Sequence, residues 1–110
     1  MKLRCDLLVS YNRLGYLYNN MNNLKQAKIF YQKCLILCEA IVKETKNDVD
    51  ADDNLVDSYI NVACIQKPYN RNMLEKAIKI NNKLMKKCPE VVRFAERCTF
   101  LNTLLSECIK

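Results

Sequence analysis

Apolar residues recur along the first half of the chain at the three- and four-residue spacing of an amphipathic helix. One such stretch covers about residues 3–19 and ends in the polar run Asn19–Asn23. A second runs from Leu24 to about Thr45, with Asn23 placed to cap it and Gln26 to complete a capping box. The apolar stripe of this second stretch comprises Leu24, Ala27, Phe30, Tyr31, Cys34, Leu35, Cys38, Ile41 and Val42. The two stretches predict a helical hairpin.

The second half of the chain predicts three more helices. The third covers about residues 52–66, after an acidic linker at 47–54, and ends before Pro68. The fourth covers about 73–87, capped by Asn72 with Glu75 three positions later. The fifth covers about 90–109, with Pro89 in its first turn. Its expected apolar stripe is Val91, Val92, Ala95, Cys98, Leu101, Leu105 and Cys108. The chain is therefore predicted to be all-α.

The first hairpin carries a specific pattern of residue sizes, Tyr11-x-x-Leu14-Gly15-x-x-Tyr18 and then Ala27-x-x-x-Tyr31-x-x-Cys34. A residue without a Cβ lets two helix backbones approach closely, and small residues on the facing helix leave room for that approach. The pattern resembles the tetratricopeptide (TPR) repeat. Tyr59-x-x-Val62-Ala63 resembles the first part of it again.

The resemblance implies a right-handed stack of two TPR-like helix hairpins plus a C-terminal capping helix. Repeat one would cover about residues 3–46, repeat two about 52–88 and the capping helix about 90–109, within a single domain. A long second helix followed by an acidic linker is similar to TPR segments of large bacterial multidomain proteins. Such a small stack buries limited surface, so we expect it to belong to a longer protein or to self-associate.

Composition favours a protein that resides in the cytoplasm. The chain has 110 residues, enough for one domain with one continuous core. No apolar run approaches the ~18 residues of a membrane span. The first residues, Met1–Asp6, lack the apolar core and cleavage site of a signal peptide. Seven cysteines, an odd number, indicate thiols used as small apolar side chains in a reducing compartment.

The sequence offers no basis for catalysis, a cofactor or a metal. There is no histidine to act as a base at neutral pH, and a single glycine cannot make a phosphate-binding loop. Cys34 and Cys38 are spaced as metal ligands can be, but both belong to an apolar stripe, so core packing is the favoured interpretation. The acidic run after Asp48 is not an EF-hand loop, because its sixth and twelfth positions are Asp53 and Tyr59.

The resemblance places recognition on the first helix of each pair, which lines a concave groove in TPR arrays. The candidate groove residues are Asn12, Tyr16, Asn19, Asn61, Arg93 and Arg97. Asn61 and the two arginines are similar to part of the family's carboxylate clamp, whereas Asn12 and Tyr16 depart from it. The expected function is a non-catalytic protein-protein interaction module that presents this groove to a peptide or a neighbouring domain.

An alternative is a basic surface that binds nucleic acid or an acidic partner. The formal net charge is +6, and the fourth helix carries Lys76, Lys79, Lys83 and Lys86. Such a face can bind phosphates through counterion release. The same lysines also lie at the spacing of an ordinary solvated face, and no aromatic residues alternate with them for base stacking.

Overall fold

The computed structural model describes residues 2–65 and 67–109. Within these ranges the chain forms five helices and no strand: α1 (Lys2–Asn20), α2 (Leu24–Glu44), α3 (Val49–Cys64), α4 (Arg71–Lys87) and α5 (Val92–Ile109). The prediction of an all-α fold is confirmed. Each helix packs against the next one along the chain, from α1 to α5.

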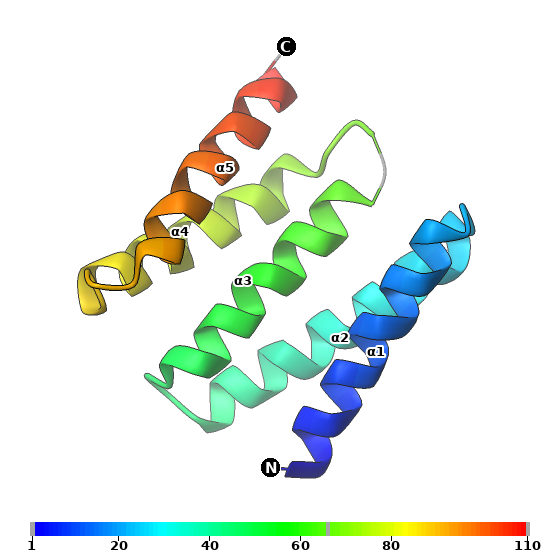
Figure 1. The fold of residues 1–110 in the computed structure, drawn as a ribbon, viewed down its shortest axis with the longest axis horizontal. Coiled ribbons are helices and arrows are strands. Elements are labelled where there is room, and N and C mark those ends of the chain that lie inside the picture. Colours follow the sequence, from blue (N-terminus) through cyan, green and yellow to red (C-terminus); the bar gives the residue numbers. More distant parts are fainter. Residues whose placement is uncertain (1, 66, 110) are drawn as a thin grey trace.

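The helices form two layers. Figure 1 shows α1, α3 and α5 running side by side in the same direction, with α2 and α4 crossing behind them as the return segments. The molecule measures 41 × 37 × 21 Å, and its short dimension matches two layers of helices about 10 Å thick. This is a stack of two helical hairpins plus a C-terminal helix, an α-solenoid arrangement in which each unit buries its apolar face against its neighbour.

The start of α3 differs from the predicted one. α3 begins at Val49, so most of the segment expected to be an acidic linker is helical. The carboxylate of Asp48 caps it by accepting hydrogen bonds from the backbone N–H groups of Asp50 and Ala51, at 2.9 and 3.2 Å. Asp50 and Asp52 lie in the first turn, where the helix dipole favours negative charge. The acidic run is therefore a helix start.

Two other helix starts also differ from the predicted ones. α4 is capped by Asn70 and not by Asn72, because the Asn70 side chain accepts a hydrogen bond from the Met73 backbone N–H at 3.2 Å. Pro89 lies in a turn ahead of α5, which begins only at Val92. The cap of α2 is confirmed, since the Asn23 side chain accepts from the Gln26 N–H at 3.3 Å.

The core follows the predicted stripe on α2 except at Leu24, which is 41% exposed, and follows the α5 stripe in part, since Leu101 is buried and Val91, Leu105 and Cys108 pack against the core. Ala27, Tyr31, Cys34, Leu35, Cys38 and Ile41 are all buried. On α5, Val92 is 66% exposed and Ala95 is also exposed, whereas Phe94 is completely buried together with Leu101 and Leu104. Val92 and Ala95 were therefore wrongly predicted to be inside, Phe94 and Leu104 lie on the inner face in their place, and Arg97 shares that face with them.

Aromatic side chains join α1 to α2. The rings of Tyr18 and Phe30 stack with centroids 5.6 Å apart, and Tyr11 meets the same Phe30 ring at 6.3 Å. Gly15 is buried between them, facing Tyr31. The large residues of the sequence pattern therefore fill the space around a close approach of the two helices.

Candidate binding groove

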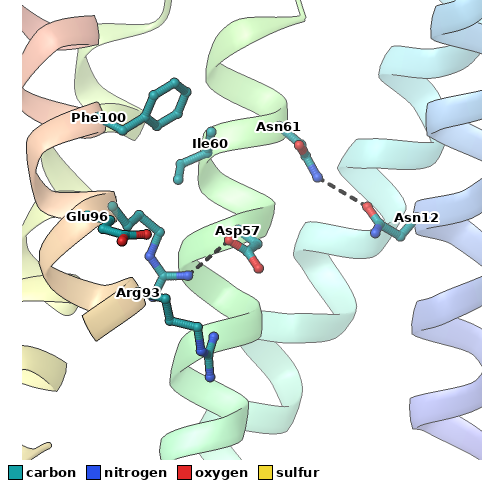
Figure 2. A pocket seen from close by; sticks show the side chains of 8 residues that line it. Asn12, Asp57, Ile60, Asn61, Arg93, Glu96 and Phe100 are labelled. Atoms are coloured by element: carbon teal, nitrogen blue, oxygen red, sulfur yellow. Dashed lines mark hydrogen bonds and ion pairs between the residues drawn. The ribbon is translucent and has the colours of Figure 1, made fainter. Parts of the chain in front are cut away.

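The layer formed by α1, α3 and α5 carries an open cavity of about 550 Å³. All three helices contribute side chains to it, as Figure 2 shows. The lining residues are Asn12 from α1, Asp57, Ile60 and Asn61 from α3, and Arg93, Glu96, Arg97 and Phe100 from α5. The cavity exists because α1, α3 and α5 do not pack directly against one another. Each packs instead against α2 or α4 behind them, which holds the three helices of this layer apart.

Four of the six predicted groove residues line this cavity: Asn12, Asn61, Arg93 and Arg97. The Asn61 side-chain amide donates a hydrogen bond to Asn12 Oδ1 at 3.1 Å, which links α3 to α1 across the layer (Figure 2). Tyr16 lines a neighbouring cavity of about 260 Å³. Asn12 and Asn61 border both cavities, so the two form one continuous surface.

Asn19 does not belong to either of these cavities. It is exposed and lies at the penultimate position of α1. The groove is therefore centred on the middle of α3 and the first half of α5.

Arg97 is held in a network of polar side chains from three helices. Its Nε donates to Asn81 Oδ1 at 2.9 Å, and its Nη1 lies 2.6 Å from Asp53 Oδ1 and 3.0 Å from Asp57 Oδ1. The side chains of Arg97 and Asp53 are only 12% and 11% exposed. Asn81 also donates from Nδ2 to the backbone carbonyl of Phe94 at 2.9 Å. The network ties α3, α4 and α5 together beneath the groove.

Arg93 pairs with the same carboxylate, since its Nη1 lies 2.5 Å from Asp53 Oδ2. Both arginines are thus neutralised by carboxylates of their own chain. The remaining Nη2 of Arg97 is buried without a hydrogen-bond partner, so it is out of reach of a ligand in the groove. Of the residues similar to a carboxylate clamp, Arg97 has its donors engaged or buried, whereas Arg93 is 59% exposed and keeps donors besides the Nη1 that pairs with Asp53.

Asp53, Asn81 and Glu96 belong to the site although none of them is among the candidate groove residues from the sequence. Asp53 was assigned to a solvated linker, and only the early start of α3 brings it under Arg97. Asn81 carried a usable signal, because it lies at core spacing between Ala77 and Leu84 and a polar residue there requires partners.

Partial burial raises the pKa of Asp57 from its ordinary value, against the lowering effect of Arg97.

The basic candidates lie on α4, in the other layer. Lys76, Lys79, Lys83 and Lys86 are all exposed. The Lys76 ammonium lies 5.9 Å from the centroid of the Tyr59 ring. Arg71 and Glu75 form an exposed ion pair at the start of the same helix. The lysines present a positive surface separate from the groove.

Cys34 and Cys38 are core residues. Both thiols lie near the hydroxyl of Ser58, at 3.5 and 3.2 Å, and they are 3% and 1% exposed. The hydrogen bond with Cys34 and burial raise the pKa of Cys38. Across residues 2–65 and 67–109, no group of three or more cysteine, aspartate or glutamate side chains is arranged to hold a metal ion.

Comparison with protein families identifies the first hairpin. Residues 8–40 match the family model described as tetratricopeptide repeat. The first hairpin is a TPR. The match covers this hairpin, and TPR repeats are generally protein-protein interaction modules. No match was found among curated proteins or among solved structures. None of the helices in the described ranges combines the length and the apolar character that crossing a membrane requires.

Proposed function

We propose that this TPR-like chain is a non-catalytic interaction module whose groove on α1, α3 and α5 binds a peptide or a neighbouring domain of a larger protein. One observation carries the proposal: polar and apolar side chains from all three helices of one layer converge on a single open cavity. Peptide recognition needs this combination, with apolar contacts for affinity and a few placed polar groups for orientation.

Asn12 and Asn61 are suited to binding a peptide backbone. Their mutual hydrogen bond uses one donor of Asn61 and the carbonyl oxygen of Asn12. An amide side chain has two donors and an acceptor with two lone pairs, so Asn12 keeps its donors and Asn61 keeps its acceptor. The pair can thus offer one donor and one acceptor to the same peptide unit, with Tyr16 beside them as an exposed aromatic contact.

Selection from a phage library of random dodecapeptides, with the whole chain as the target, tests the proposal. Asn12→Ala, Tyr16→Ala and Asn61→Ala should each weaken binding of a selected peptide. Asn102→Ala, at an exposed position of α5 outside the groove, is the control and should bind as the parent does. If no peptide is enriched, or if the three groove variants bind like the parent, the proposed groove function is wrong.

A second candidate function is supported by the exposed lysines of α4. In the described part of the chain, Lys79, Lys83 and Lys86 form no ion pair, so their charges are available to an acidic partner or to nucleic acid phosphates. A 20-base-pair DNA probe distinguishes the two functions. Binding by the lysine face should fall steeply as salt increases and should be lost on reversing these three charges, whereas groove binding should change little.

Self-association and location are part of the same proposal. Leu7, Leu17 and Met21 are exposed and share the side of α1 that faces away from α3 by helical spacing. The opposite end of the stack is polar, with Thr99, Asn102, Thr103 and Ser106 around a surface cavity. We propose that the apolar sides of two copies pair with each other, in the reducing environment of the cytoplasm. Light scattering that shows only monomer at high concentration would contradict the pairing.

A further inference from the structure

The charged side chains around the groove indicate which charge its ligand should carry. Two arginines, Arg93 and Arg97, and two carboxylates, Asp57 and Glu96, line the cavity there, and the buried carboxylate of Asp53 lies beneath it. The arginines are engaged with Asp53 and Asp57, whereas Glu96 forms no ion pair within the described residues. The cluster has a net negative charge of one, although the whole chain is basic. Among the charged residues that line the α1–α3–α5 cavity, Glu96 is thus the one without an ion pair in the described chain, whereas Arg13 borders the neighbouring cavity beside Tyr16.

An aromatic ring lies one helical turn from that carboxylate. Glu96 and Phe100 are four positions apart on α5, so both lie on the same side of the helix. Phe100 is 51% exposed, and Figure 2 shows its ring pointing from α5 toward Ile60 of α3, with Glu96 on the same side of α5. A ring that exposes half its surface beside a free carboxylate can contact a cation through its face while the carboxylate pairs with the charge.

On this basis we propose that the groove recognises a basic side chain, lysine or arginine, next to an apolar one in the bound peptide. The cationic group would lie between Glu96 and the Phe100 ring, and the neighbouring apolar side chain would pack on Ile60. Asn12 and Asn61 would bind the backbone between them. The inference deepens the proposed peptide-binding function and depends on it. It also states which ligands are excluded, namely acidic peptides and free C-terminal carboxylates.

The peptides enriched in the dodecapeptide selection provide the first test. They should share a lysine or arginine adjacent to a leucine, isoleucine or aromatic residue. In the best of them, replacing the basic residue by glutamate should weaken binding at least tenfold. Enriched peptides without a common basic residue, or peptides whose binding depends on a free C-terminal carboxylate, would overturn the inference and leave the groove function intact.

Variants of α5 provide the second test. Glu96→Gln should weaken binding of the basic peptide about three- to fivefold, the range of an exposed ion pair. Phe100→Ala should weaken it about three- to tenfold. The matched controls on the same helix are Glu107→Gln and Val92→Ala, which alter an exposed carboxylate and an exposed apolar residue outside the groove.

A charge exchange separates recognition from loss of folding. Glu96→Lys should bind the glutamate-substituted peptide more tightly than the parent protein does, because the exchange restores an opposite-charge pair. Equal binding of that peptide by the parent and by Glu96→Lys, with both proteins equally folded by circular dichroism, would contradict the inference. If the parent binds no peptide from the library at all, it is the proposed groove function that fails.

Discussion

A Cβ atom on Gly15 would lie 2.6 Å from both Cδ1 and Cε1 of Tyr31. The Tyr31 ring is only 6% exposed and is enclosed at the α1–α2 contact, so it has little room to move away. In Gly15→Ala, the gain in helix propensity opposes the steric effect of this contact. With this contact, the steric term should dominate. Gly15 therefore packs directly against the Tyr31 ring at the contact between α1 and α2.

We expect Gly15→Ala to lower the free energy of unfolding by about 1 kcal/mol, since strain of about 1–3 kcal/mol exceeds the ~1 kcal/mol gain in helix propensity. Gly15→Leu should cost about 3 kcal/mol or more. Denaturant melts measure both effects. Ser10→Ala, at an exposed position of the same helix, is the control and should change stability by less than about 0.5 kcal/mol.

The contact with Tyr31 can be tested by a double-mutant cycle. A smaller residue at position 31 should relieve the clash, so Gly15→Ala combined with Tyr31→Leu should be less destabilising than the sum of the two single changes. Additive effects would mean that the alanine strain arises elsewhere in α1.

A second prediction concerns the buried pair of Arg97 and Asp53. Arg97→Met removes the buried one of the two arginines that pair with Asp53 and leaves the buried Asn81 Oδ1 without its donor, which should cost about 3 kcal/mol of stability. Arg71→Met removes an ion pair whose side chains are 59% and 51% exposed, and it should cost less than about 1 kcal/mol. Thermal or denaturant melts of the two variants give the comparison. Equal costs would show that the Arg97 network does not tie the helices together.

The pH dependence of stability should reveal Tyr59. Burial, followed by the negative charge of Glu39, raises the pKa of this tyrosine to about 12. An unfolded tyrosine loses its proton near pH 10, whereas folded Tyr59 keeps it to higher pH. The unfolded state therefore binds fewer protons in this window, and stability should fall by roughly 2–3 kcal/mol between about pH 10 and 12.

Tyr59→Phe should flatten that part of the stability profile. It should also cost about 1 kcal/mol at neutral pH, because the Tyr59 hydroxyl donates a hydrogen bond to Glu39 Oε2 at 3.2 Å. Tyr16→Phe, at an exposed tyrosine, should leave the profile unchanged. If the stability of the parent protein does not change between about pH 10 and 12, the buried environment of Tyr59 is contradicted.

The thiols give a fourth prediction. Cys34 and Cys38 are buried, whereas Cys64, Cys88, Cys98 and Cys108 are partly exposed. Iodoacetamide should therefore label these last four in the native protein and should reach Cys34 and Cys38 at rates that follow global unfolding. Mass spectrometry of digested samples taken over time measures this. Early labelling of either buried thiol would place it outside the core.

The sequence was most informative where local signals agreed. For α1 and α2, helical periodicity, the Asn23 cap and the sizes of Gly15 and Tyr31 all indicate the same hairpin, and the structure contains it. Each of these signals acts over a few residues or between adjacent helices. For this reason they can be read without knowledge of the rest of the fold.

The parts that could not be predicted depend on contacts between distant residues. Asp53 is buried because Arg93 and Arg97 pair with it from 40 and 44 positions further along the chain, which the acidic run itself does not indicate. The inner face of α5 is likewise set by Arg97 and Asn81. Four of the six candidate groove residues line the cavity, but the sequence does not indicate that the two arginines there already pair with carboxylates.

The central claim, that the groove on α1, α3 and α5 binds the partner, is tested most directly by mapping the bound surface. A selected peptide is titrated into isotopically labelled protein, and backbone amide shifts are followed by NMR. The largest saturable changes should cluster at Asn12, Ile60, Asn61, Arg93 and Phe100. Changes confined to Lys76, Lys79, Lys83 and Lys86 of α4, with the groove amides unmoved, would contradict the claim.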